Sequence, residues 1–70
     1  MTLRNGTAVT WDWGTGTANG KIVETYRSKI TLTLKGSEIT RNATADAPAY
    51  RILQEDGDEV LKSGTEIRAA

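Results

Sequence analysis

Apolar and polar residues alternate along much of this chain with a period of two. The clearest stretch is residues 30–34, Ile-Thr-Leu-Thr-Leu, which is also rich in residues that favour β-strands. Val9, Trp11 and Trp13 likewise fall on one side of a strand, with polar residues between them. No stretch of ten or more residues shows the apolar spacing of a helix. The pattern therefore predicts an all-β protein.

Seven glycines and one proline divide the alternating stretches into short segments. Residues 35–37, Lys-Gly-Ser, are typical of a hairpin turn. Residues 56–57, Asp-Gly, give a stronger turn signal, because glycine tolerates the positive φ that such turns require. Residues 63–66 are typical of a short helical turn before a final Ile67. This punctuation predicts several short strands joined by tight turns.

We predict strands near residues 7–13, 18–28, 29–35, 38–43, 49–55 and 58–62, the second and third being either separate or one long bent strand. A five- or six-stranded barrel is the economical fold for such a chain, since closure removes exposed edges. The side chains that face inward on these strands form the predicted core: Val9, Trp11, Ile22, Ile30, Leu32, Leu34, Ile39, Tyr50, Ile52, Val60 and Ile67.

The inventory of residues limits the chemistry. The chain has 70 residues, no cysteine and no histidine. We expect a single domain over residues 1–70, with its core spanning about residues 5–68. The missing residue types exclude cysteine- and histidine-based zinc sites and Ser–His or Cys–His catalytic pairs. We therefore expect a non-catalytic protein without metal or cofactor.

Charge is balanced overall but not along the chain. Residues 1–42 carry six basic and three acidic side chains, a sum of +3, and residues 43–70 carry three basic and six acidic, a sum of −3. In a compact domain the two halves lie within one or two Debye lengths of about 8 Å, so the asymmetry largely blurs. Neither an apolar signal segment nor a membrane-spanning run is present. We expect a cytoplasmic monomer that does not bind membranes.

Several spaced motifs resemble one known family. They are Gly6-x-x-Val9-x-Trp11, Gly14-x-Gly16-x-x-x-Gly20-Lys21-Ile22-Val23, Ala43-Thr44-Ala45-Asp46-Ala47-Pro48-x-Tyr50-x-Ile52, and a closing Leu61-Lys62 with Ile67. Together they resemble the bacterial and fungal family of hypervirulence-associated protein TUDOR domains, formerly a domain of unknown function. The resemblance runs from about residue 5 to residue 68. It implies an SH3/Tudor-like barrel that serves as a binding module.

The aromatic residues are the first candidates for a binding site. Tudor-like barrels of other families hold methylated lysine or arginine between two to four aromatic side chains, through cation–π attraction. Trp11 and Tyr50 are expected in the core, because a small domain without phenylalanine must fill its interior with these rings. Trp13, at the tip of the first hairpin, is expected to be partly exposed. The predicted groove for a protein or peptide segment consists of Trp13, Tyr26, Asp12, Gly14 and Gly16.

Basic residues in the middle of the chain support an alternative, nucleic-acid binding. If one strand runs through this region, Arg27, Lys29 and Lys35 share the face opposite the apolar positions. With Arg41 they would form a basic stripe suited to phosphates, although a solvated polar face explains the same pattern. Salt distinguishes the alternatives, since phosphate contacts weaken steeply as salt rises.

Two further motifs indicate turns and no binding site. Gly14-x-Gly16-x-x-x-Gly20 lacks the spacing of a dinucleotide-binding loop and leads into a strand instead of a helix. The carboxylates around Gly57 lack the spacing of a calcium-binding loop, which indicates a solvated acidic turn. These carboxylates are Glu55, Asp56, Asp58 and Glu59.

Overall fold

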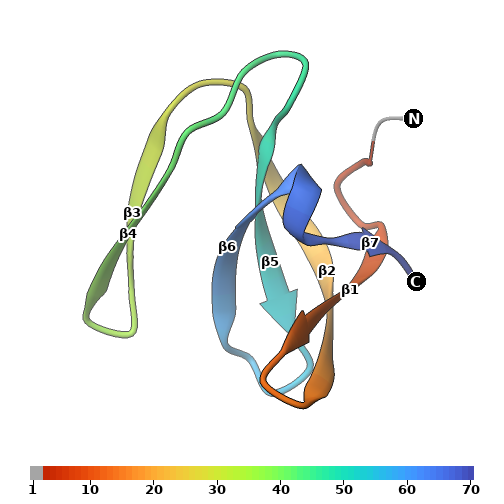
Figure 1. The fold of residues 1–70 in the computed structure, drawn as a ribbon. Coiled ribbons are helices and arrows are strands. Elements are labelled where there is room, and N and C mark those ends of the chain that lie inside the picture. Colours follow the sequence, from red (N-terminus) through yellow and green to blue (C-terminus); the bar gives the residue numbers. More distant parts are fainter. Residues whose placement is uncertain (1–2) are drawn as a thin grey trace.

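The computed structural model describes residues 3–70, which form seven strands and one short 3₁₀ turn joined by turns and loops (Figure 1). The elements are β1 Ala8–Trp13, β2 Gly16–Tyr26, β3 Ile30–Leu34, β4 Ser37–Arg41, β5 Ala49–Gln54, β6 Glu59–Ser63, η1 Gly64–Glu66 and β7 Arg68–Ala69. The all-β class and all six predicted strands are confirmed, and residues 18–35 form two separate strands. The additional strand, β7, is only two residues long.

The main sheet is a meander interrupted by one hairpin. β1, β2, β5 and β6 pair antiparallel in turn, and β7 returns beside β1, which gives the order β6-β5-β2-β1-β7. β2 is eleven residues long, and the register shift between Ile22 and Glu24 marks a bulge in its pairing with β5. A bulge bends a strand and increases its twist. This arrangement is consistent with a small SH3/Tudor-like barrel, although residues 3–70 form no strand ladder that closes the sheet into a ring.

β3 and β4 form a hairpin of their own, which stands beside β6 in Figure 1. Its turn is tight because Lys35 and Gly36 both have positive φ, 53° and 77°. Two successive positive φ angles match the right-handed twist of the flanking strands. The hairpin is thus a compact insertion between β2 and β5.

The core lies on one face of the main sheet. The cross-strand register places Val9 and Trp11 of β1 on the same face as Ile22, and Ile22 lies opposite Ile52. All four are at most 3% exposed and, with Tyr50 and Ile67, they form one buried cluster. The predicted core is confirmed for these six residues.

Gly20 lets β5 approach β2 closely at this core. A Cβ atom at Gly20 would lie 2.5 Å from Cγ2 of Ile52 and 2.7 Å from the carbonyl oxygen of Leu53. Neither atom belongs to a mobile surface chain, because Ile52 is fully buried and the Leu53 oxygen is backbone. The absence of a side chain at residue 20 therefore sets the spacing of the two central strands.

A second buried region lies on the opposite face of the sheet. Ile52 pairs with Val60, so the neighbouring pair Arg51 and Leu61 points to the other face. Leu61 is 1% exposed but does not belong to the core cluster. Besides β5, the strands in contact with β6 are β3 and β4. The hairpin therefore covers Leu61.

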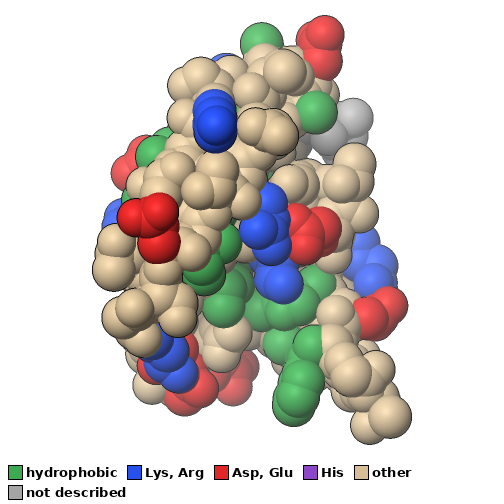
Figure 2. All heavy atoms as spheres, turned by 60° about the vertical axis from the view of Figure 1, so that its left-hand side comes forward, with side chains coloured by type: hydrophobic (Ala, Val, Ile, Leu, Met, Phe, Trp, Pro, Cys, Tyr) green, Lys and Arg blue, Asp and Glu red, His purple; other side chains and the backbone are tan. Residues whose placement is uncertain are grey.

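This cover is incomplete, which corrects part of the predicted core. Four apolar side chains of the hairpin were expected to be buried but are only half-buried: Ile30, Leu32, Leu34 and Ile39. Val60 is also only partly buried, whereas Ala49 and Leu61 are buried without having been predicted. In Figure 2, where the hairpin comes forward, hydrophobic side chains remain visible in a hollow among basic and acidic ones. The alternation correctly predicts which face these residues take but not how well that face is covered.

Ion pairs hold both ends of the hairpin. At its tip, Lys35 pairs with Asp58, and the hydrogen bond and charge of Asp58 raise the pKa of Lys35. At its base, Nε of Arg41 donates to Oε1 of Glu66 at 2.9 Å. The same oxygen of Glu66 accepts the Ser63 amide at 2.8 Å, which ties η1 to the hairpin.

These contacts shift the pKa of the Glu66 carboxyl group. Burial alone would raise the pKa of its carboxyl group, but hydrogen bonds from Arg41 and the Ser63 amide oppose it. The charges of Arg41 and Lys62 act in the same direction, and the pKa ends below its usual value. Glu66 is therefore ionised where it links β4 to the segment after β6.

Candidate binding surface

Trp13 is the most exposed large apolar side chain of the described residues, at 65%. Trp11, two residues earlier on the same face of β1, is 3% exposed. The difference arises because Trp13 is the last residue of β1 and pairs with Gly16, the first residue of β2. The core thus ends before Trp13, which confirms that Trp11 is buried and Trp13 is exposed.

The neighbours of Trp13 leave its ring accessible. A Cβ atom at Gly16 would lie 3.9 Å from Nε1 of the indole, so the ring lies near a residue that has no side chain. Gly14 makes the turn with a φ of 50°. On the adjacent position, Asp12 accepts a hydrogen bond from Nη2 of Arg68 at 3.0 Å, although its side chain is 72% exposed. The tip therefore presents an aromatic ring on one face of β1, while the Asp12 carboxylate lies on the other face and already has a cationic partner.

Tyr26 does not lie at this tip. It is the last residue of β2, whereas Gly16 opposite Trp13 is the first. At about 3.3 Å per residue, an eleven-residue strand places its ends some 30 Å apart. Tyr26 is also half-buried. The structure brings Trp13, Asp12, Gly14 and Gly16 together and leaves Tyr26 at the other end of the sheet.

The basic residues divide into two groups. Arg27 and Lys29 lie exposed in the connection between β2 and β3, and Arg41 is near them because it pairs with Ile30. Lys35 lies at the far end of the hairpin. Arg41 and Lys35 already have acidic partners, and the exposed face between the two groups carries threonines and Glu38. The stripe is therefore interrupted by polar side chains.

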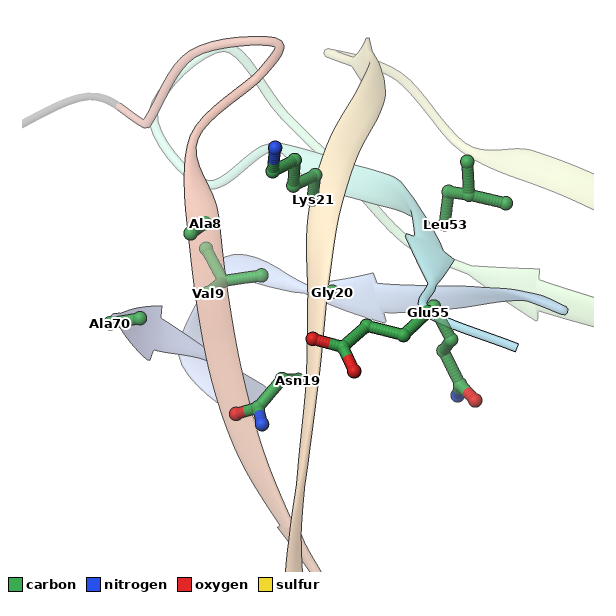
Figure 3. Close-up of a pocket in the computed structure, with 9 residues that line it drawn as sticks. Ala8, Val9, Asn19, Gly20, Lys21, Leu53, Glu55 and Ala70 are labelled. Atoms are coloured by element: carbon green, nitrogen blue, oxygen red, sulfur yellow. The ribbon is translucent and has the colours of Figure 1, made fainter. Parts of the chain in front are cut away.

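A hollow that the sequence did not predict lies over β1, β2 and β5 (Figure 3). Its volume is about 570 Å³, and residues that line it include Ala8, Asn19, Lys21, Leu53 and Glu55. Leu53 is 40% exposed and also lines a smaller hollow of about 310 Å³ beside the hairpin tip. The available signal is the consecutive apolar pair Ile52-Leu53, which indicates apolar side chains on both faces of β5.

Metal and membrane sites are not apparent in the described part of the chain. Among residues 3–70, no three Asp or Glu side chains converge as metal ligands would. No helix within these residues is long and apolar enough to span a membrane.

Comparison with known families places the chain in one of them. The family model described as "Hypervirulence associated proteins TUDOR domain" matches residues 6–67, nearly the whole chain. The chain belongs to this TUDOR domain family. No curated protein and no solved structure matches it significantly. Membership in the TUDOR domain family confirms the resemblance in the sequence and is consistent with a small binding module.

Proposed function

We propose that this TUDOR domain is a non-catalytic binding module that takes a protein or peptide segment at the tip of β1 and β2. The observation that carries the proposal is the exposure of Trp13, 65%, beside a buried Trp11. In one strand, the indole of Trp11 thus lies in the core and the indole of Trp13 lies in solvent. Large exposed aromatic rings are uncommon on free surfaces and enriched at interfaces.

The chemistry of the tip suits a peptide. An indole offers a broad apolar face and attracts cations, which is worth about 0.5–1 kcal/mol at exposed sites. Asp12 lies on the opposite face of β1 and binds Arg68, so the indole is the group of the tip that would hold a cation. The two glycines of the turn leave the ring open to a partner backbone. A segment with a basic or methylated basic side chain would place that side chain on the indole.

The experiment is a heteronuclear NMR titration with lysine-containing peptides, unmethylated and trimethylated, at low and moderate salt. We expect shifts at Trp13, Asp12 and Gly16 that persist at moderate salt, and their loss in Trp13→Ala. The Trp13 indole signal is the readout in the unmodified protein, and the Asp12 and Gly16 amide signals are the readout in Trp13→Ala. Peptide shifts elsewhere, or equal shifts in Trp13→Ala, would contradict the proposal.

Single-stranded DNA and RNA serve as competing ligands in the same titration. Binding at Arg27, Lys29 and Arg41 would weaken steeply with salt, because phosphate contacts release counterions. Salt-sensitive shifts confined to these residues would favour the nucleic-acid alternative over the peptide site.

A further inference from the structure

The second candidate surface is the hollow over Leu53, on the face of β5 away from the core. The register forms a row across the sheet: Glu59 of β6 pairs with Leu53, Leu53 pairs with Lys21, and Lys21 pairs with Ala8 of β1. The β3–β4 hairpin covers Leu61 in this layer but leaves Leu53 40% exposed. Leu53 thus forms an apolar floor where the cover ends.

The shape of the hollow suits a side chain of a partner. The hollow has a volume of about 570 Å³, within the range of about 300–1,000 Å³ that ligand sites occupy. Residues with little or no side chain, Ala8 and Gly20, line it beside Leu53. A long aliphatic side chain could therefore lie over Leu53 and remove its apolar surface from water.

The charges around the hollow define the rest of the ligand. Of the four carboxylates at the turn between β5 and β6, Asp58 pairs with Lys35 and Glu59 lies 3.9 Å from Arg51. Within residues 3–70, Glu55 and Asp56 form no ion pair. Glu55 lines the hollow, and a further recess of about 220 Å³ is lined by both. The side of the hollow nearest this turn is therefore negative.

Lys21 gives the hollow a direction. In Figure 3, Lys21 and Glu55 lie on opposite sides of Gly20, with the Glu55 carboxylate near Asn19. A ligand with a basic group toward Glu55 would leave its backbone carbonyls near the Lys21 ammonium. An acidic ligand would place its charge toward Lys21 and away from both unpaired carboxylates.

We infer that this hollow docks a peptide segment in which a long aliphatic side chain lies close to an arginine or lysine. The aliphatic side chain covers Leu53, and the basic side chain pairs with Glu55 and Asp56. This surface differs from the Trp13 tip and does not depend on it. A domain with both surfaces would contact a partner on two faces.

The experiment uses the 70-residue chain and capped pentapeptides, followed by NMR at low salt. The probe peptides carry one leucine and one arginine in an alanine background, at adjacent, next-nearest and third-neighbour spacing. Matched peptides replace arginine with glutamine or leucine with serine. We expect shifts at Asn19, Lys21, Leu53 and Glu55, with affinity reduced about two- to fivefold without arginine and about tenfold without leucine.

Variants assign the contacts. Leu53→Thr keeps a β-forming residue at a half-open position and should reduce binding of the leucine–arginine peptide to the level of the serine peptide. Glu55→Gln with Asp56→Asn should abolish the preference for arginine over glutamine. Glu38→Gln, an exposed carboxylate on the hairpin, is the matched control and should leave that preference unchanged.

Three results would overturn the inference. The first is equal binding of the arginine and glutamine peptides. The second is the absence of shifts at Leu53 at peptide concentrations up to about 5 mM, which would mean a dissociation constant too high for specific binding. The third is a shift of the same residues on concentrating the protein alone, which would assign the hollow to a second copy of the chain. Trp13→Ala separates the two surfaces, because it removes binding at the tip and leaves the Leu53 hollow intact.

Discussion

The five-stranded sheet and the β3–β4 hairpin have similar apolar residues but differ in how those residues are covered. Ile52 of β5 is fully buried in a cluster with side chains from β1, β2 and Ile67, whereas Ile39 of β4 is half-buried. One face of the sheet carries the core, and the hairpin covers part of the other face of the sheet. The strands of the hairpin lie beside β6, and two ion pairs link its ends to Asp58 and Glu66. A partly buried apolar face and these two ion pairs hold the hairpin against the rest of the fold.

This difference shows that alternation and burial are separate properties. Ile-Thr-Leu-Thr-Leu has the most regular pattern in the chain, yet its apolar residues are only half-buried, whereas Ala49, Tyr50 and Ile52 of the less regular β5 are buried. A strand buries its apolar face fully only when a second layer covers that face along its whole length. The apolar face of the hairpin is covered only where the hairpin lies against the edge of the sheet.

The largest effect is expected from Ile52→Ala in the sheet core. The substitution removes three buried carbons and should lower the free energy of unfolding by about 3–4 kcal/mol. A domain of this size has only about 3–5 kcal/mol available from its core. Urea denaturation followed by circular dichroism should therefore find the variant largely unfolded without denaturant. A stable variant would show that the core contributes less than its burial indicates.

Gly20→Ala tests the close approach of the β2 and β5 backbones in the sheet core. The added methyl group would overlap Ile52 and the Leu53 carbonyl group, which predicts a loss of about 1–3 kcal/mol by overpacking. Gly16→Ala is the matched control, since its Cβ atom would meet ordinary contacts at 3.9 Å. Urea midpoints of the two variants measure the difference. Equal midpoints would mean that β2 and β5 separate at little cost.

Ile39→Ala repeats the Ile52 substitution on the hairpin. Because this side chain is only half-buried, we expect a loss of about 1 kcal/mol, well below that at Ile52. Hydrogen exchange provides a second measure, in which amides of β3 and β4 should exchange faster than those of β2 and β5. A loss at Ile39 equal to that at Ile52 would break the comparison and make the hairpin part of one cooperative core.

The smallest effect is expected from Glu66→Gln, which removes the ion pair at the base of the hairpin. The Glu66 side chain is 36% exposed, so the loss should be only about 0.5 kcal/mol. Since folding lowers the pKa of Glu66, its contribution is present above about pH 4.5 and disappears as the pH falls through the lower folded value. The difference between wild type and variant in urea midpoint should therefore be seen at pH 7 and shrink as the pH falls below about 4.5. A difference that persists in acid would assign it to packing.

The sequence predicts the sheet well because local signals agree there. The glycine turns and the parity of Val9, Trp11 and Ile52 indicate the same strands and the same inner face. Burial of Leu61 depends on a hairpin folded from residues 30–41, which no local signal positions. The consecutive apolar pairs Ile52-Leu53 and Val60-Leu61 do indicate that something covers the second face of the sheet, because apolar residues on both faces are typical of a strand covered on both sides.

The candidate sites show a similar division. Exposure of Trp13 follows from its position at the end of a strand, and the residues around it are local in sequence. The prediction that groups Tyr26 with Trp13 fails because β2 continues unbroken through eleven residues and separates the two aromatic side chains. The hollow over Leu53 combines residues from β1, β2 and β5, and pairing registers between distant strands are needed to assemble it.

The contrast between the two tryptophans also has an optical consequence. The chain contains only Trp11 and Trp13, of which the first is 3% exposed and the second 65%. An indole in an apolar core emits at shorter wavelength and resists quenching by acrylamide, whereas an exposed indole emits to the red and is quenched. Unfolding changes the first signal, and a partner at the proposed tip site would change the second. The emission spectrum of the unmodified protein therefore reports folding and binding as separate events, with no added label.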